Sequence, residues 1–151
     1  MDRNTAKDLL HLRDWLDRAH EIVDRGRDAN LRDDLLQEAG DSLMMKLGEA
    51  SNRLSRAGFP GPRGLKWTDA IANRNWLIHQ YDEIDREITW TTLARDLPKW
   101  RQALAGAFES AEGALASDSN ADRSDQDPEP RSAGSLYDEY LRERALEEGE
   151  L

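Results

Sequence analysis

The sequence contains no cysteine, and this absence excludes three classes of site. A chain without thiols has no disulfide framework, no thiolate zinc site and no cysteine nucleophile. The sequence also lacks any run approaching the roughly 18 apolar residues that a membrane span needs. Charged residues, among them Arg3 and Lys7, interrupt its amino terminus. We therefore expect a cytoplasmic protein that has no membrane partner.

The sequence also has fewer basic than acidic residues. The chain has 21 Lys and Arg residues against 31 Asp and Glu, for a net charge of −10, whereas nucleic-acid phosphates are usually met by an excess of Lys and Arg. The imbalance is uneven, because residues 117–151 hold 4 basic and 11 acidic residues while residues 1–116 hold 17 and 20. The net charge of the whole chain therefore argues against nucleic-acid binding, whereas the body alone carries only −3 and has no broad basic face.

The composition divides the chain into a folded body and an acidic tail. A length of 151 residues with 38% apolar residues fits one domain, which we place at 1–116. Residues 117–135 contain almost nothing apolar and cannot offset the entropy of ordering, so we expect a disordered linker there. Within the tail at 117–151, Leu136, Tyr140 and Leu141 fall on one side of a short helix at 135–148. A docking helix and a solvated tail both fit this pattern.

The body has a helical spacing of apolar residues and no alternating strand pattern. A stretch rich in Gly and Pro at 57–66 reads as a loop and lacks the ending of a phosphate-binding loop. We expect Asn30 and Thr68 to cap the second and third helices, and Asp96 to open the last. The fold class is therefore all-α, an up-and-down bundle of four to five helices. The predicted helical segments are 5–25, 30–54, 68–80, 85–93 and 96–116.

One stretch of the third helix carries unusual chemistry. Arg74, Asn75, His79 and Tyr81 place a cation, an amide, an imidazole and a phenol within eight residues of an apolar helix. The spacing alone leaves two interpretations open. Arg74 could pair with a carboxylate such as Asp82, Asp85 or an acid on another helix, with His79 and Tyr81 as ordinary residues of a helix end. Alternatively, the set is a reactive site.

The surroundings of this stretch extend the pattern. It resembles the HepT-like ribonuclease toxins of the HEPN superfamily, in which an Arg is followed by four residues, His, one residue and Tyr. The resemblance spans most of the body, although Asn73 stands where the family more often has an apolar residue. The residues that carry it are Leu47-Gly48-Glu49-Ala50, Trp67, the Arg74–His79–Tyr81 motif, Tyr81-Asp82-Glu83-Ile84-Asp85, Ile88, Trp90 and Asp96-Leu97-Pro98.

The resemblance implies a metal-independent endoribonuclease without cofactors, acting as a homodimer whose cleft is lined by Arg74 and His79. An imidazole exchanges protons near neutral pH, and a guanidinium holds phosphate oxygens through a fork of N–H groups. Asn75 would add a neutral hydrogen bond or position His79. The 2′-hydroxyl of the substrate would be the nucleophile, so RNA and not DNA is the expected substrate.

The resemblance also implies partners. The protein would be the toxin of a toxin–antitoxin module, neutralised by an MNT-type nucleotidyltransferase antitoxin that transfers AMP to Tyr81. The alternative is a non-catalytic HEPN binding module that serves as the regulatory partner of a nucleotidyltransferase.

Helix geometry constrains the motif. At about 100° per residue, Arg74 and His79 lie about 140° apart around a straight helix. Either the helix ends near Ile78, so that His79 leaves the helical direction, or Arg74 reaches toward His79 of a second copy.

Three other groups of residues have simpler interpretations. Asp17 and His20 resemble half of a metal site, but no second pair accompanies them, so we expect no metal. The five tryptophans fall at helical periods and are expected in the core or at a dimer contact more than as stacking platforms. Arg25, Arg27 and Arg32 form either a modest basic patch or a solvated loop, and the loop is favoured.

Overall fold

The computed structural model describes residues 1–80, 82–124, 142, 144 and 145, and the regular elements in these residues are all helices. The all-α prediction is therefore confirmed. Met1–Asp118 forms one compact unit, and Ser119–Leu151 is a second unit. No helix in the described part of the chain is long and apolar enough to cross a membrane.

Helix α1 (Arg3–Asp24) begins at a capped residue and ends at a glycine turn. The Asp2 carboxylate accepts a hydrogen bond from the Thr5 backbone N–H at 2.8 Å, and this bond lowers the pKa of the carboxyl. After α1, Gly26 has a φ of 94°, which glycine adopts without steric cost, and this turns the chain into α2 (Arg27–Arg32).

Helix α3 (Asp34–Arg56) starts later than the sequence pattern predicts. The prediction that Asn30 caps the second helix is wrong, because Asn30 is buried within α2. Asp33 is the cap instead, since its extended backbone lets the carboxylate accept from the Leu35 N–H at 2.9 Å. The segment expected as one helix is therefore two.

Helix α4 (Trp67–His79) carries the motif and is anchored at its start. The indole N–H of buried Trp67 donates to the Phe59 carbonyl at 2.9 Å. The helix begins at Trp67 with Lys66 at the cap position, so the prediction of Thr68 as the cap is wrong.

The helices after α4 are shorter and more broken than predicted. Helix α5 (Arg86–Thr91) starts close to the predicted position, and the Asp85 carboxylate caps it by accepting from the Glu87 N–H at 3.0 Å. A π-helical turn, η1 (Thr92–Asp96), leads into α6 (Leu97–Ala103), and α7 (Ala105–Ser124) follows a break at Leu104. Residues 117–124, expected in the linker, are therefore helical, and the predicted helix at 135–148 lies outside the described residues apart from 142, 144 and 145.

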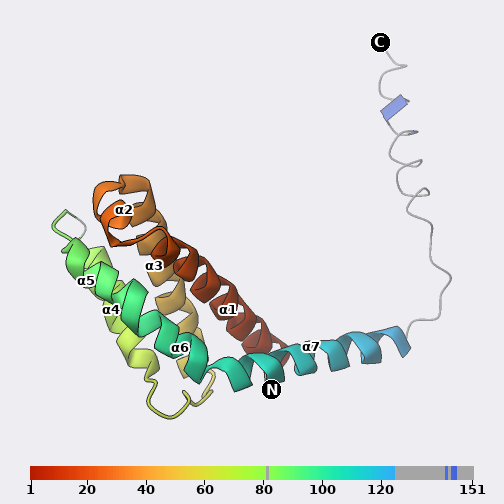
Figure 1. Ribbon diagram of the computed structural model, residues 1–151. Helices are drawn as coiled ribbons and strands as arrows, with labels where there is room; N and C mark the ends of the chain where they lie inside the picture. Colours follow the sequence, from red (N-terminus) through yellow and green to blue (C-terminus); the bar gives the residue numbers. More distant parts are fainter. Residues whose placement is uncertain (81, 125–141, 143, 146–151) are drawn as a thin grey trace. The chain divides into compact units, whose positions relative to one another are not determined.

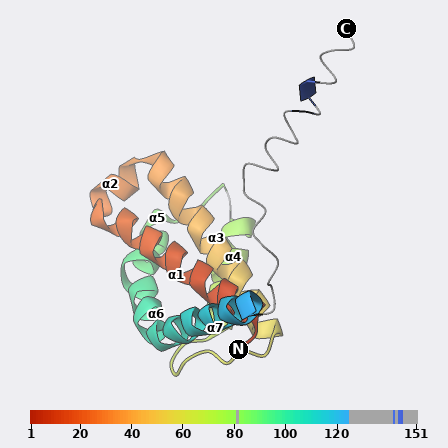
Figure 2. The same ribbon diagram turned by 90° about the vertical axis from the view of Figure 1, so that its right-hand side faces the viewer.

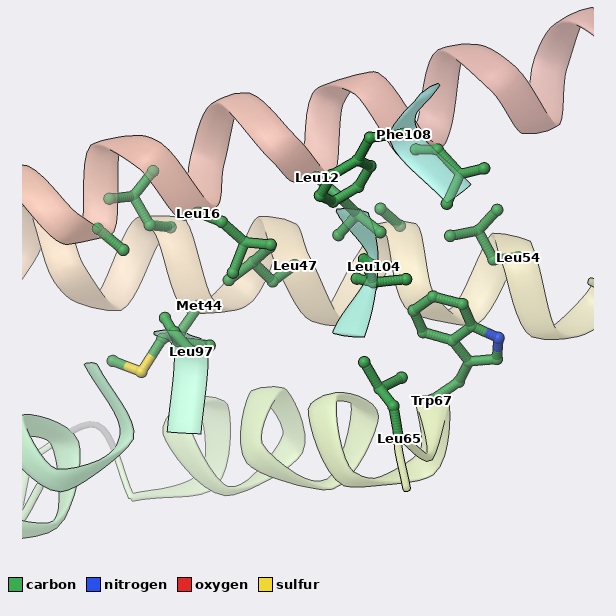
Figure 3. Close-up of a cluster of buried hydrophobic side chains, with 14 of the residues drawn as sticks. Leu12, Leu16, Met44, Leu47, Leu54, Leu65, Trp67, Leu97, Leu104 and Phe108 are labelled. Atoms are coloured by element: carbon green, nitrogen blue, oxygen red, sulfur yellow. The ribbon is translucent and has the colours of Figure 1, made fainter. Parts of the chain in front are cut away.

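The core of the first unit lies between α1, α3, α4 and α6, with the first turns of α7 (Figure 1). Leucines from α1 and α3 meet along their facing sides, and Leu104 and Phe108 pack against them in the same cluster (Figure 3). Trp67 and Trp100 pack edge to face with their ring centroids 5.9 Å apart, which confirms core packing for this pair.

Helices α3 and α4 approach each other closely at Gly48. A Cβ atom on Gly48 would lie 2.5 Å from the Arg74 Cβ and 2.9 Å from the Ala70 carbonyl oxygen. Real Cβ atoms do not tolerate such distances, so the two helices pack here only because residue 48 is glycine.

We predict that Gly48→Ala destabilises the fold by about 1–3 kcal/mol, since the added methyl group must separate α3 from α4. The matched control is Gly113→Ala in α7, where nothing lies within 4 Å of the new Cβ and helix propensity predicts a gain of up to about 1 kcal/mol. Urea unfolding measures both. Equal effects of the two substitutions would contradict the close approach.

Candidate active site

Arg74 lies on the side of α4 that faces α3, and its side chain is only 17% exposed. Its Nη1 donates to the Glu49 Oε1 at 3.3 Å. The acid that pairs with Arg74 is thus on another helix, one of the alternatives that the spacing left open. Because Glu49 is 61% exposed, water screens the pair and its energy is small.

Asn75 holds the other edge of the same guanidinium. Its Oδ1 accepts from the Arg74 Nε at 3.4 Å and from Nη2 at 3.2 Å. Three of the five N–H groups are engaged in these bonds, and the other two can donate to a phosphate oxygen. The three bonds are long for hydrogen bonds from N–H donors, so replacing them with bonds to a phosphate group costs little free energy. The site therefore presents an oriented cation.

His79 is the last residue of α4, and its side chain is exposed. Because α4 continues through His79, His79 and Arg74 stay separated by about 140° around the helix axis. Within the described residues, no hydrogen bond or ion pair joins His79 to Arg74. Tyr81 lies outside the described residues. The structure thus brings Arg74, Asn75 and Glu49 together and leaves His79 on another face.

Two large apolar side chains, one on α4 and one on α5, are exposed to solvent. Ile78, immediately before His79, is 52% exposed, and Ile88 on α5 is 51% exposed. Ile78 is thus an apolar side chain beside His79 that is available for contact with another protein.

Two ion pairs join α5 to α3 and α2. Arg86 donates to Asp41 on α3 at 2.8 Å, and the guanidinium of Arg27 on α2 bonds the Glu87 carboxylate. Arg27 is therefore committed to Glu87 and is not part of a basic patch. The roles of Gly48 and Glu49 were missed by spacing arguments, although both stand in the Leu-Gly-Glu-Ala stretch that carries part of the resemblance.

The residues considered for a metal site have other contacts. Asp17 accepts from Arg101 Nε at 2.9 Å, and His20 lies 3.5 Å from Asp24. Across residues 1–80 and 82–124, no group of three or more His, Asp and Glu side chains converges as metal ligands would.

Comparison with known proteins places this geometry in a family. The family described as Ribonuclease HepT-like matches residues 12–106, a range that includes Gly48, Glu49 and the Arg74–His79 pair. A protein of Methanocaldococcus jannaschii named "Putative RNase MJ1380" is 26% identical over 106 residues, which cover 66% of this chain and 93% of the relative. No solved structure matches. With its helical fold and its Arg-x4-His motif on α4, the chain belongs to the HepT-like ribonuclease family of the HEPN superfamily.

Proposed function

We propose that the protein is the ribonuclease toxin of a toxin–antitoxin module and cleaves RNA without a metal ion. The observation that carries this proposal is the Arg74 guanidinium, which α3 and Asn75 orient while two of its N–H groups stay available within the family's motif. A forked cation in this setting suits a scissile phosphate.

The reaction needs one base and one acid. His79 of one copy takes the proton from the ribose 2′-hydroxyl, and the 2′-oxygen attacks phosphorus. The bond from phosphorus to the 5′-oxygen breaks, which leaves a 2′,3′-cyclic phosphate. A protonated His79 imidazole gives its proton to the leaving 5′-oxygen. Arg74 exchanges its long bonds to Glu49 and Asn75 for bonds to the phosphate oxygens, where negative charge develops.

The site is completed by a second copy of the chain. Arg74 faces α3 and His79 ends α4 on another side, so one phosphate contacts both residues most readily when Arg74 belongs to one copy and His79 to the other. Exposed Ile78 next to His79 supplies an apolar contact for such a homodimer.

We predict that the purified protein cleaves cellular RNA in EDTA and that His79→Ala and Arg74→Ala each reduce the rate by about 100-fold or more. The matched controls are His20→Ala and Arg63→Ala, which remove exposed side chains outside the candidate site and should retain full activity. Cleavage that EDTA abolishes, or equal rates for all variants, would contradict the proposal.

We predict that Ile78→Glu weakens the homodimer and lowers RNA cleavage with it, since a carboxylate would be buried at the apolar contact. Leu35→Glu is the control, because Leu35 is 75% exposed at the start of α3. Light scattering across a dilution series reports the oligomeric state. A dimer unaffected by Ile78→Glu would place the interface elsewhere.

Neutralisation is proposed to occur at Tyr81, two positions after His79. An AMP group there would bring bulk and negative charge to the place where the RNA phosphate binds. We expect co-expression with an MNT-type nucleotidyltransferase encoded beside the gene to add the mass of one AMP to the protein. The Tyr81→Phe variant should gain no such mass. Intact-mass and peptide spectrometry measure this, and an addition that survives Tyr81→Phe would assign another acceptor.

One observation favours a second candidate function. The Arg74 charge is matched by Glu49 and no contact joins it to His79 in the described part of the chain, as a non-catalytic HEPN partner of a nucleotidyltransferase would allow. Expression of the gene alone separates the candidates. Growth arrest that His79→Ala abolishes supports the toxin, and normal growth supports the binding module.

A further inference from the structure

Helices α1 and α3 lie side by side (Figure 2). Side chains of both helices line a groove between them. It consists of two adjoining hollows of about 320 and 530 Å³ that share Arg18, Leu43 and Lys46. Arg25 lines the first hollow, and His11 and Trp15 line the second. We call this surface the α1–α3 groove. It contains no residue of the Arg74–His79 motif.

The groove is lined by more cations than unpaired acids. Among the residues that the structure describes, no ion pair neutralises Arg18, Arg25 or Lys46. Of the groove's acids, Asp17 binds Arg101 at 2.9 Å. Asp14 lies 3.9 Å from Arg13, whose guanidinium also bonds Glu112, so Asp14 and Glu21 remain beside the three cations. A polyanion therefore finds three available cations here.

One part of the groove offers a stacking surface. The His11 and Trp15 rings lie 5.5 Å apart with an interplanar angle of 18°, so they are stacked. The His11 side chain is exposed. A flat base can stack on such a ring pair whatever its identity, and this contact adds affinity without adding charge.

The groove leads toward the candidate active site. Lys46 and Glu49 are both exposed on α3 and are three positions apart, so they are neighbours on the helix surface. Glu49 in turn contacts Arg74. A strand lying in the groove would pass over Lys46 and reach Arg74 after about one helical turn.

We propose that the α1–α3 groove binds single-stranded RNA, with phosphates on Arg18, Arg25 and Lys46 and a base on the His11–Trp15 pair. The direction of the strand toward Arg74 rests on the proposed ribonuclease function, whereas binding in the groove does not. The groove gives an acidic protein a local positive track for its substrate.

The test measures binding of a fluorescent 2′-O-methyl single-stranded oligonucleotide, which lacks the nucleophile and is not cleaved. The full-length protein is titrated by anisotropy between about 50 and about 200 mM salt. We expect Arg18→Ala/Lys46→Ala to weaken binding about tenfold or more at low salt and to reduce the slope of log affinity against log salt by about 1.4, since each lost phosphate contact removes about 0.7.

The control has the same change of charge at another place. Arg63→Ala/Lys66→Ala removes two exposed cations from the loop before α4 and should leave the slope within about 0.3 of the wild-type value. His11→Ala should weaken binding roughly tenfold with the slope unchanged, because stacking releases no counterions. Arg18→Lys/Lys46→Arg should restore binding.

Two results would contradict RNA binding in the groove. One is an equal effect of the two double alanine variants, and the other is wild-type binding by Arg18→Ala/Lys46→Ala. The proposed function fails separately. If the oligonucleotide binds through the groove and the same sequence in unmodified RNA is not cleaved, the groove stands and the ribonuclease proposal falls. If unmodified RNA is cleaved and the groove variants bind normally, the reverse holds.

Discussion

The close approach of α3 and α4 at Gly48 is the constraint on which the candidate site depends. No residue with a Cβ fits there, because the atom would lie 2.5 Å from the Arg74 Cβ. The stem of Arg74 consequently lies against α3, and its guanidinium emerges beside Glu49 and Asn75. The direction of the key cation is thus set by a glycine 26 positions earlier in the chain. The same packing keeps Arg74 off the face where His79 ends α4.

The sequence predicted the helical class well because helix periodicity is a local property. The α1 stripe and the start of α5 near Asp85 follow from residues a few positions apart. The errors concern helix starts, where several local caps compete. The Trp67 indole at the first residue of α4 bonds the Phe59 carbonyl, and the segment around Asn30 breaks at Asp33, whose carboxylate accepts from the Leu35 N–H. Neither choice is visible in the spacing of apolar residues.

In the candidate site, too, some features could be predicted from the sequence and others required the fold. The motif and its surroundings indicated the family, which the match over residues 12–106 confirms, while the roles of Arg74, Asn75 and His79 stay predictions. The partner of Arg74 and the α1–α3 groove required the fold. Arg18 and Lys46 are 28 positions apart and meet only because α1 packs on α3. A net charge of −10 therefore described the chain as a whole and concealed a local excess of cations.

A site shared between two copies is the central claim, and mixing inactive variants tests it most directly. Arg74→Ala and His79→Ala proteins are unfolded together, refolded and assayed on RNA. A mixed dimer regains one complete site only when Arg74 and His79 act across the interface, so the account predicts recovery to about a quarter of wild-type activity for random pairing of equal amounts. Activity that stays at the level of the separate variants, while mixed dimers are demonstrably formed, would contradict it.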